Sequence, residues 1–243
     1  MTETYGADLA YIHDAGFRDY SRRAAPGVLA LLRRNRVRGG LVVDLGCGSG
    51  RWACQLTRRG YAVLGIEQSA AFVRIAREVA PSARFVRGSL WNVNIPSCDA
   101  VTAIGECINY VLRRRSAPAP LFRRIHNALR PGGIFVFDAA APDRIPPAPR
   151  QSWMEGTDWA ILAESRRGPQ ARTLVRRIVA YRKIGARFRR SEETHVLRLY
   201  SPAEILGALI GADFEAEELP GYGRFRPFEG IHVYLARRPL TRI

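Results

Sequence analysis

Residues 42–50 read Val-Val-Asp-Leu-Gly-Cys-Gly-Ser-Gly, and this stretch decides the fold. An apolar run that ends at the acidic residue Asp44 is typical of a strand buried in a parallel sheet. Gly46, Gly48 and Gly50 follow in a turn, where they have no side chain to obstruct a ligand, and a helix pattern begins directly afterwards. A strand, a glycine-rich turn and a helix N-terminus together predict a nucleotide-sized site at the carboxyl edge of a parallel sheet.

The glycine spacing distinguishes between kinds of nucleotide site. A dinucleotide site needs a glycine three residues after the second one, and counting from Gly48 that position is Arg51. A phosphate-binding P-loop needs Gly-Lys-Ser/Thr, which the turn lacks. An acidic residue before the glycines is instead the pattern of class I S-adenosylmethionine-dependent methyltransferases, and the chain resembles that family.

The resemblance continues in order along the chain. Further strands are expected at residues 61–67, 83–90, 99–104 and 134–138, with a helix at residues 121–129 and a Pro-Gly-Gly breaker after it. The match is dense over residues 40–140 and thinner elsewhere. It implies an α/β fold: a Rossmann-like doubly wound sheet that is mostly parallel with an antiparallel last strand.

The resemblance also implies S-adenosylmethionine as cofactor and S-adenosylhomocysteine as product, without a metal. Glu67 lies about 20 residues after the glycines, where its two carboxylate oxygens can accept hydrogen bonds from ribose hydroxyls. Ser89 stands where the family usually has an acidic residue, so a hydrogen bond to the adenine amino group would lack charge assistance. The expected cofactor-binding residues are Tyr11, Asp44, Gly46, Cys47, Gly48, Glu67, Gln68, Ser89, Leu90 and Gly105.

Methyl transfer from a sulfonium requires an aligned nucleophile, exclusion of water and, for a protonated nucleophile, removal of a proton. In the family, the segment after the fourth strand faces the substrate. We expect catalytic roles for Glu106, Tyr110 and His195, and substrate contacts from Asn109, Arg198 and Tyr222.

Each of these roles has a structural alternative. Glu106 could cap the next helix, and His195 could be a satisfied buried polar residue. Arg198, whose planar guanidinium suits a carboxylate on the substrate, could instead pair with Glu192, Glu193 or Glu204.

Two segments flank the core in sequence. The N-terminal arm carries Tyr5, Tyr11, His13, Phe17 and Tyr20, followed by a helix pattern over residues 24–37. In many small-molecule methyltransferases such an arm folds over the cofactor as a lid, although aromatic residues at this spacing can also be plain packing.

A proline-rich connector after Asp138 leads to β-rich sequence without helical period. We therefore expect three parts: a lid and cofactor-binding core at residues 1–142, an inserted antiparallel β cap at residues 143–200, and a return to the core sheet at residues 201–243. Ser201, Pro202 and Glu204 predict a capped helix at the start of the last part.

Composition limits the cellular setting. No apolar run is long enough to span a membrane, and the N-terminus lacks a basic-then-apolar signal pattern. The four cysteines form neither Cys-x-x-Cys pairs nor a disulfide framework, which favours a cytoplasmic protein with reduced thiols. The oligomeric state is left open.

The formal net charge of +16 raises the possibility of a nucleic-acid substrate. However, Lys183 is the only lysine and the arginines are scattered, so that only Arg113–Arg115 form a dense run. Coding bias explains this skew as well as phosphate binding does. The segment used to methylate exocyclic base amines, Asn/Asp-Pro-Pro-Tyr/Phe, is also missing after the fourth strand.

We therefore expect a methyltransferase that acts on nitrogen or oxygen of a small-molecule acceptor. Two alternatives stay open: a tRNA or rRNA methyltransferase that uses the basic surface, and a non-catalytic cofactor-binding protein.

Overall fold

The computed structural model describes residues 4–110 and 118–240, so the arginine run Arg113–Arg115 lies outside the described residues. The helices are α1 (Ala7–Gly16), α2 (Asp19–Arg34), α3 (Arg51–Thr57), α4 (Ala70–Val79), α5 (Pro118–Ala128) and α6 (Pro202–Ile210), with short 3-10 turns η1 (Cys107–Asn109) and η2 (Pro142–Arg144). The core strands are β1 (Leu41–Leu45), β2 (Ala62–Glu67), β3 (Arg84–Arg87), β4 (Cys98–Ala103), β5 (Leu129–Ala140), β10 (Glu215–Leu219) and β11 (Ile231–Arg237). Between β5 and α6 lie β6 (Arg150–Glu155), β7 (Trp159–Arg167), β8 (Thr173–Ile184) and β9 (Arg187–Arg198).

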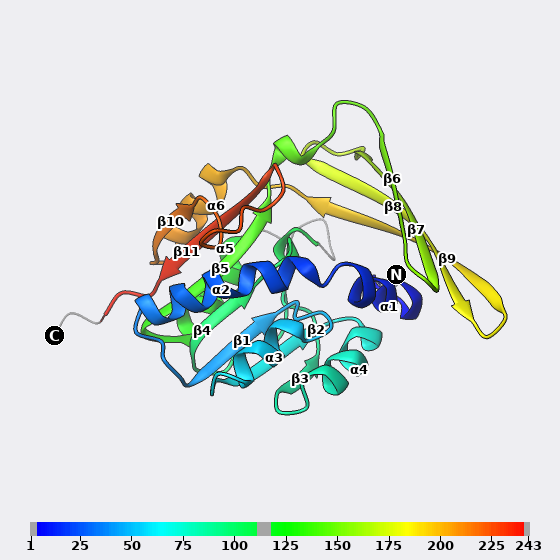
Figure 1. The fold of residues 1–243 in the computed structure, drawn as a ribbon. Coiled ribbons are helices and arrows are strands. Elements are labelled where there is room, and N and C mark those ends of the chain that lie inside the picture. The colour runs from blue at the N-terminus through cyan, green and yellow to red at the C-terminus, as the bar shows by residue number, and fades with distance from the viewer. Residues whose placement is uncertain (1–3, 111–117, 241–243) are drawn as a thin grey trace.

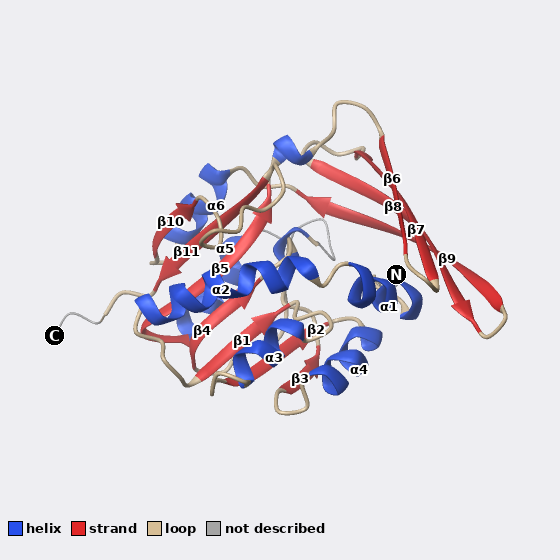
Figure 2. Ribbon diagram, viewed as in Figure 1, coloured by secondary structure: helices blue, strands red, loops and turns tan. Residues whose placement is uncertain are grey.

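The core strands form one seven-stranded sheet in the order β10-β11-β5-β4-β1-β2-β3 (Figures 1 and 2). Strands β1 to β5 pair in parallel, whereas β11 runs antiparallel to both of its neighbours. The strand order reverses between β1 and β4, which opens a crevice above their carboxyl ends. The expected fold class is therefore confirmed, including the antiparallel last strand.

Helices cover both faces of this sheet because its central strands are apolar on both sides. Val42 of β1 packs in a core with α2, α3 and α4, and its neighbour Val43 packs in a second core with α5 and α6. Successive strand residues point to opposite faces, so the apolar run quoted above supplies both cores at once.

Strands β6 to β9 form a separate antiparallel sheet, with two-residue or longer turns between them. In Figure 1 this sheet, coloured from green to yellow, stands beyond the carboxyl ends of β4 and β5, with α1 beside it. Leu9 and Ile12 of α1 pack against Trp159, Ile161 and Ile178 of this sheet. We call this four-stranded sheet the cap.

Two elements differ from the sequence-based expectation. Helix α2 begins at Asp19, five residues before the expected start, and keeps Pro26 in its interior. Its first turn is stabilised by tertiary packing, since the Tyr20 ring contacts Phe225 at a centroid distance of 5.2 Å. The expected breaker after α5 instead belongs to the long strand β5, where Gly132 adopts a positive φ of 80°.

The expected capping box at α6 is present, with Ser201 and Glu204 satisfying each other's backbone N–H groups. None of the helices that the structure describes is long and apolar enough to cross a membrane.

Candidate active site

The glycine turn between β1 and α3 forms one wall of a cavity. The Gly46 and Cys47 backbone N–H groups donate to the Ile66 carbonyl at 2.8 and 3.2 Å, which ties the turn to β2. A Cβ atom on Gly46 would lie 2.7 Å from the Cys107 Sγ atom, so packing alone requires glycine there. Gly48 has a φ of 52°, and a Cβ atom on it would meet no other atom within 4 Å, so its backbone is accessible to a ligand.

Asp44 lies buried at the end of β1. Its Oδ1 atom accepts a 2.8 Å hydrogen bond from the Thr102 hydroxyl, which in turn accepts one from the Trp52 indole. Burial raises the pKa of Asp44 to about 7, the Thr102 hydrogen bond lowers it, and the nearby Glu67 carboxylate raises it. A cationic group placed beside Asp44 would favour its ionised form.

Glu67 ends β2 next to the same turn. Its Oε2 atom accepts from the Gly48 N–H at 3.1 Å and its Oε1 atom from the Ser69 N–H at 2.8 Å. Burial raises the pKa of this carboxyl, and these backbone hydrogen bonds lower it. Each carboxylate oxygen has two lone pairs, so Glu67 keeps acceptor capacity for ligand hydroxyls.

The loop after β4 forms the opposite wall and is held by Asp138 of β5. This fully buried carboxylate accepts hydrogen bonds from the Gly105 and Glu106 N–H groups and from the hydroxyls of Tyr20 and Tyr222. Glu106 takes a φ of 60° in this loop, a conformation that costs a non-glycine residue about 1–3 kcal/mol. Asp138 stabilises that strained conformation.

Glu106 faces the cap. Its two carboxylate oxygens lie 3.2 and 3.1 Å from the Arg176 Nη2 atom of β8, and both side chains are largely buried. Burial lowers the pKa of Arg176, but the Glu106 carboxylate outweighs this and raises it. The cap thus contributes a fixed positive charge to the β4 edge of the cavity.

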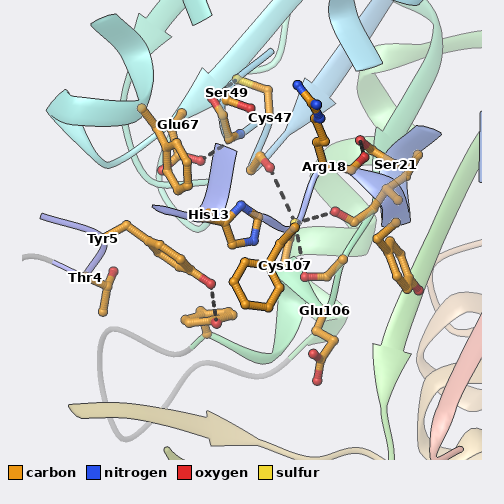
Figure 3. A pocket seen from close by; sticks show the side chains of 18 of the residues that line it. Thr4, Tyr5, His13, Arg18, Ser21, Cys47, Ser49, Glu67, Glu106 and Cys107 are labelled. Atoms are coloured by element: carbon orange, nitrogen blue, oxygen red, sulfur yellow. Dashed lines mark hydrogen bonds between the residues drawn. The ribbon is translucent and has the colours of Figure 1, made fainter. Parts of the chain in front are cut away.

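The N-terminal arm supplies an aromatic wall. The Tyr5 hydroxyl lies 3.0 Å from the Tyr110 hydroxyl, and the His13 ring packs on Tyr5, Phe17 and Phe72. Burial lowers the pKa of His13 to about 4, despite the opposing effect of Asp14, so His13 is neutral at pH 7. In Figure 3, His13 and Cys107 lie between Glu67 on one side and Glu106 on the other.

These walls enclose a cavity of about 690 Å³ that extends from the glycine turn to the cap. Nine of the ten expected cofactor-binding residues line it, namely Asp44, Gly46, Cys47, Gly48, Glu67, Gln68, Ser89, Leu90 and Gly105. Two of the expected catalytic residues, Glu106 and Tyr110, line it as well. The sequence therefore identified the correct sheet edge for the cavity.

Tyr11 and His195 lie outside the cavity lining. The Tyr11 hydroxyl donates to Asp158 of the β6–β7 turn, and the Arg182 guanidinium stacks over its ring at 3.6 Å. His13 of α1 and Tyr5, which precedes this helix, line the cavity, whereas Tyr11 packs against the cap. The His195 side chain is buried behind Tyr5 and Tyr110, with its Nε2 atom 2.8 Å from Glu193.

The three expected substrate residues are also placed elsewhere. Asn109 is buried and holds core and cap together, through hydrogen bonds with the Ala140 backbone and the Arg198 carbonyl. The Arg198 side chain is exposed near the Tyr200 ring. Tyr222 is buried and does not belong to the cavity lining, and its hydroxyl donates to Asp138.

Arg176 and Asp138 were missed as site residues. Arg176 follows Leu174 and precedes Ile178 on one face of β8, and both of these neighbours are buried. A charged residue within an apolar stripe was the sequence feature that could have identified it. The role of Asp138 depends on hydroxyls that lie 84 and 118 residues away in sequence, so no local pattern reveals it.

S-adenosylmethionine fits the chemistry of these residues. The accessible backbone at Gly48 suits a closely approaching ligand, Glu67 suits ribose hydroxyls, and the buried Asp44 suits an ammonium group. Ser89 and Leu90 line the cavity where the adenine ring would lie.

Comparison with known proteins agrees with this assignment. Residues 42–133 match a family described as "Methyltransferase domain". A Streptomyces fradiae protein named dTDP-3-amino-3,6-dideoxy-alpha-D-glucopyranose N,N-dimethyltransferase is 27% identical over 215 residues, covering 86% of this chain and 83% of its own.

Two solved structures extend the likeness to the cap. The CcbJ methyltransferase from Streptomyces caelestis is 25% identical with a TM-score of 0.78, covering 97% of this chain and 98% of its own. CalS10, an amino pentose methyltransferase from Micromonospora echinaspora solved with S-adenosylmethionine bound, is 20% identical with a TM-score of 0.76, covering 98% and 100%. The glycine turn, the sheet topology and these matches together show that residues 42–133 are a methyltransferase domain and that the chain has the class I fold of S-adenosylmethionine-dependent methyltransferases.

Proposed function

We propose that this enzyme transfers the methyl group of S-adenosylmethionine to an amine nitrogen of a small-molecule acceptor. The observation that carries the proposal is the Glu106 carboxylate, which lies at the β4 edge of the cavity and is oriented by Arg176. A carboxylate at this position can bind a substrate ammonium and accept its proton, whereas a neutral hydroxyl gains less from that negative charge.

The chemistry divides between the bound cofactor and the side chains. S-adenosylmethionine supplies a methyl group already activated by its positively charged sulfur. When bound, it would pass this methyl group to the amine nitrogen and would keep the electron pair of the broken carbon–sulfur bond on sulfur. The proton that the ammonium must lose passes to Glu106, and the aromatic wall of Tyr5, His13 and Tyr110 excludes water.

The names of the relatives support an amino sugar as the acceptor. The Streptomyces fradiae relative is named for N,N-dimethylation of an amino-deoxy sugar, and CalS10 is described as an amino pentose methyltransferase. An amino sugar combines an amine with hydroxyls, and a cavity of about 690 Å³ holds such a group beside the cofactor.

The test compares matched acceptors and a matched pair of variants. We expect an amino sugar to gain methyl groups, measured by mass, and the sugar with a hydroxyl in place of the amine to gain none. Glu106→Gln should lower kcat/KM by about 10²–10⁴ with retained affinity for S-adenosylhomocysteine.

Glu164→Gln on β7 is the control, since within the described residues the polar partners of its carboxylate are the cap side chains Gln151 and Arg166. Methylation of the hydroxyl sugar at the rate of the amine, or full activity of the Glu106→Gln variant, would contradict the proposal.

A further inference from the structure

A buried carboxylate lies behind the cavity wall that carries Glu106. Asp138 of β5 is fully buried and does not belong to the cavity lining. None of the ion pairs within residues 4–110 and 118–240 includes it. Burying a carboxylate without a cationic partner costs free energy, and a neutral amide would accept a backbone hydrogen bond at lower cost. The charge therefore indicates a role beyond support of the backbone.

The two oxygens of Asp138 meet different parts of the chain. Oδ1 accepts from the Glu106 N–H at 2.6 Å, and the Gly105 N–H lies 3.0 Å from both oxygens. Oδ2 accepts from the hydroxyls of Tyr20 and Tyr222 at 2.9 and 2.8 Å. Hydrogen bonds to a charged acceptor are about twice as strong as neutral ones. The two tyrosines thus fix the orientation of the carboxylate, and its other oxygen holds the loop after β4.

Packing holds both tyrosines as rigid donors. Tyr20 of α2 and Tyr222, which follows β10, both place their rings against Phe225, at centroid distances of 5.2 and 6.5 Å. A Cβ atom on Gly27 would lie 2.2 Å from the Tyr222 carbonyl, so α2 packs directly against this turn. Burial and the Asp138 charge raise the pKa of both tyrosines, which keeps their hydroxyls protonated and able to donate.

The loop that Asp138 holds has an unusual backbone. Gly105 and Glu106 take positive φ values of 96° and 60° in succession, and a non-glycine residue keeps such a conformation only where its surroundings enforce it. Glu106 lies at the N-cap position of η1, yet its side chain forms no capping hydrogen bond. Its carboxylate is directed to the cap instead, where both oxygens contact Arg176.

The backbone at Glu106 determines where its carboxylate lies. A misplacement of a reacting group by about 1 Å can lower a rate by about 10². We propose that Asp138, oriented by the Tyr20 and Tyr222 hydroxyls, is a positioning residue that sets the Glu106 carboxylate at the reacting end of the cavity. This inference rests on the proposed function for the task of Glu106. Asp138 lies outside the cavity lining, so it acts through the loop and not on the acceptor.

Kinetics of methyl transfer to an amino sugar separate positioning from general support of the fold. Asp138→Asn keeps the size of the side chain but replaces one acceptor oxygen with an NH2 donor, and Tyr222→Phe removes a hydroxyl outside the cavity lining. We expect kcat to fall by about tenfold or more in Asp138→Asn and by about threefold or more in Tyr222→Phe. The KM for the acceptor and the affinity for S-adenosylhomocysteine should stay within about twofold of wild type. A loss of cofactor affinity that parallels the loss of kcat would overturn the inference.

A double-mutant cycle identifies the group through which Asp138 acts. In the Glu106→Gln background, Asp138→Asn should lower kcat by less than about twofold, because the carboxylate that it positions is already absent. Asp99→Asn is the matched control, since Asp99 also accepts a backbone N–H, that of Leu41, but lies near the opposite end of β4. Its effect on kcat should be small in both backgrounds. Losses that multiply when Asp138→Asn and Glu106→Gln are combined would contradict the positioning role.

NMR of the Arg176 guanidinium provides a readout that does not require turnover. Contact with Glu106 restrains this guanidinium, so Asp138→Asn and Tyr222→Phe should speed its rotation and the exchange of its N–H hydrogens, as Glu106→Gln does. Arg176→Lys assigns the signals, and melting temperatures verify folding. Wild-type Arg176 signals in folded Asp138→Asn protein would overturn the inference. A loosened Arg176 in Asp138→Asn, together with full methylation activity of Glu106→Gln, would instead count against the proposed function alone.

Discussion

At the scale of single residues, the buried carboxyl of Asp44 should make cofactor binding depend on pH. Its pKa of about 7 lies above its ordinary value of 3.8 because burial disfavours the charged form. Between about pH 4 and 7, Asp44 therefore keeps its proton in the folded protein but loses it in the unfolded chain. The stability that the protonated Asp44 contributes is fully present below about pH 4 and is lost as the pH rises through that window.

The corresponding prediction concerns affinity. The cofactor carries an ammonium that prefers the ionised Asp44, so the affinity for S-adenosylhomocysteine should rise by about tenfold between pH 6 and pH 8. Asp44→Asn should bind more weakly and lose this dependence, as measured by calorimetry at both pH values. If the affinity of the variant rises equally between pH 6 and pH 8, another group, such as the neighbouring Glu67, is responsible for the pH dependence.

Gly48 provides a second prediction at this scale. Valine at a φ of 52° is strained and its side chain would enter the space kept open at the cavity wall, so Gly48→Val should abolish cofactor binding. Gly60→Val is the matched control, since Gly60 also has a positive φ of 84° and open space but lies in an exposed turn after α3. We expect similar losses of melting temperature in both variants and loss of affinity in Gly48→Val alone. Wild-type affinity in Gly48→Val would place the cofactor elsewhere.

At the scale of secondary-structure elements, the N-terminal arm joins the cap to the cofactor edge. Glu193 of β9 accepts hydrogen bonds from the Tyr5 and Gly6 N–H groups at 2.7 and 2.8 Å. On the other side, Asp14 of α1 pairs with Arg51 at the start of α3 through two hydrogen bonds. The arm is thus anchored to both parts that border the cavity, which supports the predicted role of the arm as a lid.

Removing the Glu193 anchor should loosen this lid. Glu193→Ala leaves two backbone donors without partners, at a cost of about 1–3 kcal/mol, so the amides of Tyr5 and Gly6 should exchange hydrogen faster. Affinity for S-adenosylhomocysteine should fall several-fold as Tyr5 leaves the cavity. Glu192→Ala is the control, because in the described part of the chain Glu192 forms ion pairs with exposed arginines of the cap, Arg177 and Arg190. If the two variants show the same amide exchange rates and the same affinity for S-adenosylhomocysteine, the arm is not held by Glu193.

Some of these elements could be predicted from the sequence alone, and others could not. The strand that ends in Asp44, the glycine turn and the capping box at Ser201 are local patterns, and the structure has each of them in place. The early start of α2 and the ion pair between Glu106 and Arg176 depend on contacts between segments that lie far apart in the chain. Propensity and spacing carry no information about such contacts, so these features required the structure.

At the scale of the whole molecule, the order of the strands creates the site. The strand order reverses between β1 and β4, so the connections after these two strands leave toward opposite faces of the sheet. The turns that follow β1 and β4 therefore form the two facing walls of the crevice. The cap, inserted between β5 and α6, covers this crevice and contributes Arg176. Periodicity predicted this insertion, but not which cap face meets the cavity: Arg198 was expected to face it and is exposed.

The most direct test of the proposed amine methylation follows a labelled methyl group from S-adenosylmethionine into small acceptors. We predict label in an amino sugar and none in the corresponding sugar with a hydroxyl in place of the amine. Folded Glu106→Gln protein should transfer about 10²–10⁴ times less efficiently. Label that enters RNA but no amine-bearing small molecule would contradict the proposed function.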